Sequence, residues 1–240
     1  MRVSIVIAVL DSHEVVRRQC LHFAKMPLPD DCELILVDDG SSPPLEGTAP
    51  NLTILRHNHP AAWTQPAARN MGCRAAQGEY LICTDIDHIV TLDLINAVRE
   101  TSHDFMKFRR EVAVLDEQGD FVQTPEAVLA YGFEPHRLRK GGFHIPPHTN
   151  SFAIRRQVYF DAGCVSERRV GTGIHPNREE VPFRHRLFAL RRAGKITMLD
   201  EESEGERPML YMFPNGRYCG SKDFNPFGLF HNLPRKTRVA

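Results

Sequence analysis

Two aspartates, Asp85 and Asp87, follow an apolar run at residues 80–83 and have one residue between them. If that run is a strand that continues past Cys83, both carboxylates point to the same side of it. Two such groups can share one hard cation, and Mg²⁺ or Mn²⁺ held in this way keeps positions open for substrate phosphates. The cation would offset the charge that develops on a departing nucleoside diphosphate. Two acids with this spacing also occur on ordinary solvated turns, so the spacing alone does not distinguish a metal site from such a turn.

A second acidic turn, DDGS at residues 38–41, follows another apolar run. The side chain of Asp39 can accept hydrogen bonds from a ribose hydroxyl or a base N–H, and Gly40 permits close approach to the backbone. The alternative is an ordinary turn in which the aspartate bonds its own backbone. A third motif, RNMG at residues 69–72, precedes the first acidic pair. Its Arg69 belongs either to the same site or to the exposed side of a helix.

A parallel sheet would bring these motifs together. Continuous apolar runs predict buried strands at residues 3–10, 33–37, 52–55 and 80–83, and the segments between them predict helices at 12–25 and 66–76. Ser12 is the expected cap of the first helix. In an open α/β sheet, ligands bind in a crevice outside the carboxyl ends of the strands. We therefore expect both acidic turns to line one crevice.

Beyond about residue 104 the pattern becomes irregular. It predicts a hairpin around 116–120, a Gly/His/Pro-rich loop at 141–148, strands at 151–154 and 195–199, and helices at 156–162 and 179–192, the last ended by Gly194. Long loops of this kind usually carry function or are mobile. The irregular half is therefore expected to differ in task from the regular first half.

The composition sets broad limits. The 240 residues suffice for one sizeable core, and 30 basic against 30 acidic residues argue against wholesale nucleic-acid binding. Residues 1–100 carry 8 Lys/Arg and 13 Asp/Glu, whereas residues 101–240 carry 22 and 17, which indicates divided tasks or merely different solvated faces. The spacing of the six cysteines predicts free thiols, and the sequence shows neither a cleavable leader nor an apolar run of about 18 residues. These features predict a cytoplasmic protein, with a peripheral location at a membrane as an alternative.

The order of LVDDGSS, ARNMGCRAAQGEYL and TDID after the first strand resembles the family 2 inverting glycosyltransferases, closely over residues 1–95. The resemblance implies the GT-A fold, an α/β domain with a Rossmann-like, mostly parallel sheet flanked by helices. It implies one domain over residues 1–240. Residues 1–100 would bind a nucleotide-diphosphate sugar, and residues 101–240, with their basic tail, the acceptor. The implied reaction is metal-dependent transfer, of hexosyltransferase type, to an acceptor hydroxyl.

The resemblance also assigns roles to single residues. It implies that Asp39 contacts the nucleoside base, that Arg69 approaches the nucleotide, that Asp85 touches the ribose side or the metal, and that Asp87 holds Mn²⁺ or Mg²⁺. The end of the first strand is implied to line the nucleotide through Ala8 and Asp11. The family often has an aromatic residue near this point, whereas this chain has leucine at position 10. Trp63 is either a substitute for it or a core residue.

The second half resembles the family through TNSFAIRR at 149–156 and an acidic pair at the start of a helix. That pair implies Glu180 as the catalytic base and Glu179 as the acid that positions the acceptor, although the family commonly has aspartate there. A carboxylate within reach of an acceptor hydroxyl can take its proton. Two glutamates at a helix start are also simply favourable for the helix dipole. The resemblance further implies a histidine as third metal ligand. His231 is the candidate, and its rivals are His144, His148 and His175.

Other functions stay open at this point. A sugar-phosphate nucleotidyltransferase would need a glycine-rich phosphate loop with a basic residue after the first strand, and a nicotinamide oxidoreductase would need GxGxxG there; neither is present. A non-catalytic relative that binds nucleotide-sugars or glycans is a further alternative. The acceptor could be a glycan, a lipid-linked sugar or another hydroxyl. Arginine pairs that could face an anionic acceptor, or simply solvent, occur at 109–110, 155–156, 168–169 and 191–192.

Overall fold

The computed structural model describes residues 1–59, 64–168, 170, 180–203 and 206–214. Its main sheet has seven strands in the order β12-β6-β11-β4-β1-β2-β3. These are β1 (Val3–Val9), β2 (Cys32–Asp38), β3 (Leu52–Arg56), β4 (Tyr80–Asp85), β6 (Phe105–Lys107), β11 (Phe152–Arg155) and β12 (Met198–Leu199). Only β11 is antiparallel to its neighbours, so the sheet is mostly parallel, as the sequence predicts.

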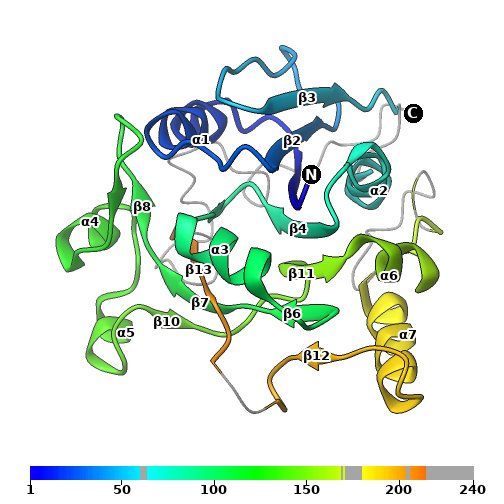
Figure 1. Ribbon diagram of the computed structural model, residues 1–240. Coiled ribbons are helices and arrows are strands. Elements are labelled where there is room, and N and C mark those ends of the chain that lie inside the picture. The colour runs from blue at the N-terminus through cyan, green and yellow to red at the C-terminus, as the bar shows by residue number, and fades with distance from the viewer. Residues whose placement is uncertain (60–63, 169, 171–179, 204–205, 215–240) are drawn as a thin grey trace, which may run out of the picture.

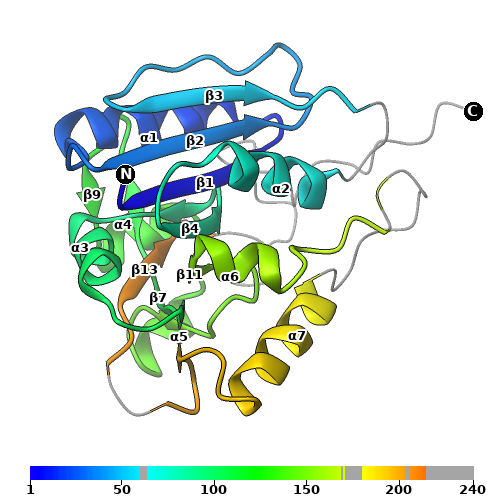
Figure 2. The same ribbon diagram turned by 45° about the vertical axis from the view of Figure 1, so that its right-hand side comes forward.

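Helices cover both faces of this sheet (Figure 1). One face carries α1 (His13–Lys25) and α3 (Leu92–Glu100), and the other carries α2 (Gln65–Ala75), α6 (Arg156–Asp161) and α7 (Glu180–Arg192). Figure 2 shows α2, α6 and α7 one below another on the same side. The α/β architecture of a Rossmann-like sheet between two helical layers is confirmed.

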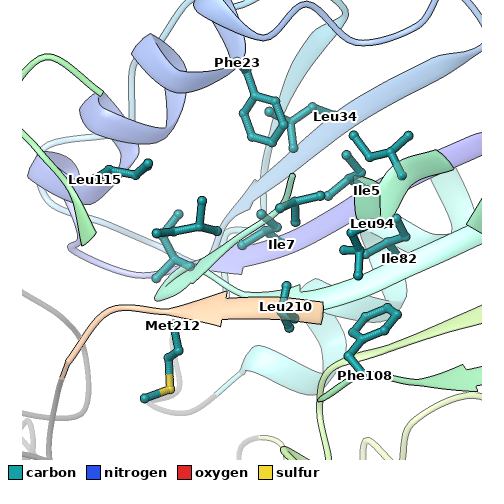
Figure 3. Packing of buried hydrophobic residues seen from close by; sticks show 14 of the residues in the cluster. Ile5, Ile7, Phe23, Leu34, Ile82, Leu94, Phe108, Leu115, Leu210 and Met212 are labelled. Atoms are coloured by element: carbon teal, nitrogen blue, oxygen red, sulfur yellow. The ribbon is translucent and has the colours of Figure 1, made fainter. Parts of the chain in front are cut away.

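β1 is almost entirely apolar because helices cover both faces of the sheet. Ile5 and Ile7 point into the cluster that contains Phe23 of α1, as Figure 3 shows, whereas Val6 and Ala8 point into the opposite cluster. Successive side chains of a strand face opposite ways, so a strand covered on both sides has no polar face to expose. Burial of each large aliphatic side chain contributes about 1.5–3 kcal/mol.

The second half of the chain adds a smaller sheet of the order β10-β7-β13-β5. Its strands are β5 (His88–Ile89), β7 (Arg109–Val112), β10 (His144–Ile145) and β13 (Met209–Met212). Between β7 and β10 the chain forms a hairpin of β8 (Val114–Leu115) and β9 (Phe121–Val122) and then two short helices, α4 (Pro125–Ala130) and α5 (Pro135–Arg139). None of the described helices is long and apolar enough to cross a membrane. The small sheet attaches the elaborated half to the turn that follows β4.

Three details differ from the sequence prediction. Ser12 stands at the start of α1, but its hydroxyl donates to the carbonyl of Leu10 and does not cap the helix. β4 ends at Asp85, so Asp87 lies in a turn and not on a continued strand. The strand expected at 195–199 is reduced to two residues because Lys195 closes the end of α7 through a hydrogen bond to Leu190. The predicted hairpin around 116–120 is confirmed.

Gly72 sets how closely α2 approaches the sheet. A Cβ atom there would lie 2.5 Å from a methyl of Val6 and 2.8 Å from a methyl of Val37. We expect Gly72→Ala to lower the free energy of unfolding by about 1–3 kcal/mol, because overpacking forces the helix away from β1 and β2. The measurement is the urea midpoint. Arg74→Ala, at an exposed position of the same helix, is the control and should change it by less than about 0.5 kcal/mol. An unchanged midpoint for Gly72→Ala would show that the contact is not tight.

Candidate active site

The register of the main sheet brings the two acidic turns together. β1 lies between β2 and β4, with Ala8 opposite Asp85 and Val9 opposite Asp38. All three strands are parallel, so their carboxyl ends meet at one edge. The expected convergence of both acidic turns at that edge is therefore confirmed by strand pairing.

Asp85 is held by a buried ion pair. Nη2 of Arg69 donates to its Oδ1 at 2.6 Å, and both side chains are nearly inaccessible to solvent. Burial alone would lower the pKa of Arg69, but the carboxylate of Asp85 outweighs this and raises it, so the guanidinium stays charged. Gln65 donates to the same oxygen at 2.9 Å. Arg69 is thus part of the site, and its alternative placement on an exposed helix face is wrong.

Asp87 and His88 complete an acidic turn beside Asp85. Ligand atoms of these three buried residues lie within 4.8 Å of one another. Two oxygens on opposite sides of a Mg²⁺ ion are about 4.2 Å apart, so a small shift would bring such atoms onto one cation. Carboxylate oxygens suit Mg²⁺ and Mn²⁺. The two carboxylates are therefore donors that suit a divalent metal, close to the spacing that one requires.

A buried arginine determines what His88 can do in this cluster. Nη1 of Arg110 lies 3.0 Å from Nε2 of His88, and because arginine has no acceptor, that nitrogen must accept the hydrogen bond. In the neutral ring the proton is then on Nδ1, which faces Oδ1 of Asp87 at 2.9 Å. These two atoms do not make a hydrogen bond with each other in this geometry, but a small rotation of either side chain would form one and let His88 orient the carboxylate of Asp87, in the manner of the outer partners that orient metal ligands.

The two aspartates of the first turn have different environments. Asp38 accepts hydrogen bonds from the backbone N–H groups of Ser41 and Leu45 and pairs with Arg56. Burial opposes these bonds, but together they lower the pKa of Asp38. It therefore has a structural role, as the ordinary-turn alternative supposed.

Asp39 has different hydrogen-bond partners from Asp38. Its Oδ1 accepts from Nδ1 of His57 at 2.8 Å and from the hydroxyl of Thr64. Burial raises the pKa of this carboxyl, and these two hydrogen bonds oppose that rise. Both bonds reach the same oxygen, so within the described part of the chain Oδ2 remains available to a ligand N–H or hydroxyl.

The end of β1 joins the two turns. Ala8 is buried between β2 and β4, where only its backbone is near the edge. Asp11 has a positive φ of 47° and binds the first acidic turn twice, through its N–H to Ser41 Oγ at 2.9 Å and through Oδ1 to the N–H of Ser42 at 2.8 Å. Asp11 thus fixes the turn that carries Asp39.

The remaining candidates fall into two groups. Glu180 is the first residue of α7 and is buried. His148 lies at the cluster, with Nδ1 3.3 Å from Oδ2 of Asp85, whereas His144 is exposed and pairs with Glu111 on the small sheet. The following candidates lie outside the described residues: Glu179, His231, His175 and Trp63.

Sequence reasoning missed several members of the site. His88 directly follows the acidic pair, so its place in the chain was a usable signal. The sequence predicts that Arg110, together with Arg109, faces solvent or an anionic acceptor, yet its side chain is buried. Nothing local in the sequence marks that burial, because it depends on the pairing of β7 with β13 about one hundred residues later.

The environment of His148 predicts a pH effect on stability. Burial lowers its pKa to about 4, against about 6.5 in an unfolded chain. Between these values the unfolded chain binds more protons, so stability should fall as the pH drops from 7 towards 4. The side chain is 32% exposed, which weakens the effect. The free energy of unfolding is measured by urea titration at pH 7 and pH 5, in the presence of chelator. We expect it to fall by about 1 kcal/mol less in His148→Gln than in the parent between these two pH values. His144→Gln is the control, and equal losses for the parent and His148→Gln would contradict the argument.

Comparison with known proteins agrees with this architecture. A crystal structure of S. aureus TarS 1–349 superposes with a TM-score of 0.53 at 15% identity, covering 89% of this chain and 61% of that one. The mannosyltransferase PcManGT from Pyrobaculum calidifontis, in complex with GDP-Man and Mn²⁺, gives 0.52 at 16% identity, with coverages of 90% and 58%. TarS 1–349 in complex with UDP-GlcNAc gives 0.50 at 15%, with 86% and 60%. The chain spans less than two thirds of the length of these neighbours, and their likeness shows the GT-A fold.

The family follows from a sequence model. No curated protein matches the chain by sequence. The family model described as Glycosyl transferase family 2 matches residues 4–163, which include β1 to β4, both acidic turns and β11. Since this match covers 160 of the 240 residues and the fold agrees with it, the protein belongs to glycosyl transferase family 2.

Proposed function

We propose that the protein is an inverting, metal-dependent glycosyltransferase that moves a sugar from a nucleotide-diphosphate sugar to an acceptor hydroxyl. The observation that carries the proposal is the convergence of Asp85, Asp87 and His88 at the end of β4, beside the turn that presents Asp39. The family match supports transfer of a glycosyl group. The complexes of PcManGT with GDP-Man and Mn²⁺, and of TarS with UDP-GlcNAc, support a nucleotide-sugar as donor.

The donor would lie along the carboxyl ends of β1, β2 and β4. Oδ2 of Asp39, which is not used by His57 or Thr64, would accept a hydrogen bond from the base, and Ala8 and Asp11 would form the wall between the two turns. Arg69 acts mainly through Asp85, because its Nη2 is committed to that carboxylate. Residues 1–100 therefore suit the donor-binding half, and residues 101–240 the acceptor half, of one domain.

Asp85 and Asp87 would hold Mn²⁺ or Mg²⁺, and His231 stays a prediction for a further ligand. When bound, the cation supplies charge stabilisation for the departing diphosphate. The chain contributes the geometry: Arg69 and Gln65 fix Asp85, while His88 faces Asp87. A cytoplasmic or membrane-peripheral location stays a prediction from the sequence.

Glu180 is the proposed base. Inversion needs an acceptor oxygen that attacks the anomeric carbon opposite the leaving diphosphate, with a carboxylate to take its proton. Glu180 is buried at the start of α7, whose N-terminal end also favours a negative charge. Glu179 would position the acceptor beside it.

The metal role predicts conditional nucleotide binding. We expect UDP or GDP to raise the melting temperature only when Mn²⁺ or Mg²⁺ is present, because the cation links the diphosphate to Asp87. Asp87→Asn should remove most of that rise. Asp30→Asn, at an exposed position just before β2, is the matched control and should keep the rise in melting temperature. An equal rise in chelator would exclude the metal bridge.

The base role predicts a loss of turnover without a loss of donor binding. Glu180→Gln keeps the size of the side chain but cannot accept a proton at neutral pH. Transfer at saturating donor should fall about 10²–10⁴-fold, while stabilisation by nucleotide with metal stays as in the parent. Glu179→Gln on the same acceptor is the matched variant and should fall less. If Glu179→Gln were the more damaging, the two roles would be exchanged; if neither lowered transfer, the base would lie elsewhere.

A further inference from the structure

A pocket of about 90 Å³ lies between the middle of α7 and the strands β6, β11 and β12. Its apolar lining comes from Phe105, Phe152, Leu187, Phe188 and Met198. Its polar lining comes from Lys107, Thr149, Ser151, Arg184, Asp200, Glu201 and Glu202. None of the donor-side residues described above contributes to it, so the pocket is a separate feature of the same molecule.

Strand pairing places this pocket beside the acidic cluster. Lys107 is opposite Phe152, and Phe152 is opposite Cys83, two residues before Asp85. At the pocket wall, Ser151 Oγ is hydrogen-bonded to Thr84 Oγ1 at 3.1 Å. Ser151, at the wall of the pocket, is therefore bonded directly to Thr84, the residue that precedes Asp85.

Helical spacing connects the pocket with the proposed base. Glu180, Arg184, Leu187 and Phe188 stand at positions i, i+4, i+7 and i+8 of α7, which share one face of a helix. Three of them line the pocket, so the first turn of the same face carries the carboxylate of Glu180. A molecule seated in the pocket would extend along this face towards that carboxylate.

The lining combines an apolar floor with paired polar groups. The rings of Phe105 and Phe152 are stacked with centroids 5.5 Å apart, and Nζ of the buried Lys107 lies 3.0 Å from Oε1 of Glu201. Asp200 is paired with Arg191 outside the pocket at 2.9 Å. A sugar ring presents C–H faces to apolar surfaces and hydroxyls to donors and acceptors such as these.

We propose that this pocket is the acceptor subsite and takes an uncharged pyranose ring, with Lys107 and Glu201 as the groups that bind its hydroxyls. The inference rests on the proposed transferase function. The volume is smaller than the roughly 150 Å³ of a cavity that encloses benzene, so the ring enters in part and its outer edge stays at the open mouth. That geometry suits the terminal residue of a glycan or a simple glycoside. The lining has three carboxylates and two cationic groups, an acidic excess that disfavours an acid such as a glucuronide.

The test measures binding of small glycosides with the nucleotide site filled. Methyl pyranosides of glucose, galactose, mannose and N-acetylglucosamine, together with methyl glucuronide, are titrated by saturation-transfer NMR in the presence of Mg²⁺ and UDP or GDP. We expect at least one neutral glycoside to bind, and Lys107→Met to weaken it at least tenfold. Glu201→Ala, at a half-exposed position with little risk to the fold, should weaken it several-fold. Lys195→Met, the same change at an exposed lysine, should not.

Separate readouts distinguish the two claims. Failure of the nucleotide to stabilise the parent with metal would remove the proposed function. If the nucleotide binds but no neutral glycoside does, or if only the glucuronide binds, the pocket proposal is wrong. Equal glycoside affinity in the parent, Lys107→Met and Glu201→Ala would also overturn it, because the ring would then lie elsewhere. Weakened nucleotide binding in Lys107→Met, with glycoside binding unchanged, would assign the pocket to the donor and overturn it too.

Discussion

The buried ion pair between Arg69 and Asp85 is the constraint on which the site depends. Two opposite charges out of water are tolerated only as a close pair, and removal of one partner typically costs about 3–5 kcal/mol. The pair joins α2 to the end of β4 at 2.6 Å. Such a short link requires the helix to lie close to the sheet, and Gly72, three residues along and on the same face, makes that approach sterically feasible. The RNMG motif therefore supplies both the charged partner of Asp85 and the small residue that lets α2 lie close to the sheet.

The acidic turn after β4 is held from the other side by the small sheet. Arg110 on β7 donates to Nε2 of His88 and to the carbonyl oxygen of Pro146, so one buried guanidinium joins the acidic turn after β4 to the 141–148 loop. The irregular half of the chain thus supports the acidic turns at the edge of the main sheet. Structural support for these turns therefore crosses the boundary between residues 1–100 and 101–240.

The first half of the fold was predictable because its strands are buried on both faces. Such strands give continuous apolar runs, and the polar residues that end them mark the functional edge. The convergence at Asp85 and Asp87 was also predictable, although the reason was wrong: a turn, not an extended strand, brings the carboxylates together. The position of His88 next to the acidic pair was a signal in the sequence, but the contact between His88 and Arg110 was not predictable. Their environment depends on two- to four-residue strands whose partners lie far along the chain, and such short strands leave little periodicity in the sequence.

The excess of basic residues in the second half looks, from the sequence, like a surface for an anionic acceptor. Within the described residues, much of that charge is already engaged inside the protein. Arg155 pairs with Asp104 and Glu79, Arg191 pairs with Asp200, and Arg110 is buried against His88. A cation that neutralises a neighbouring carboxylate contributes little field to an incoming ligand. The summed charge of the second half therefore does not identify an anionic acceptor. Even Lys107, the buried basic group in the pocket beside α7, already has its own carboxylate partner in Glu201.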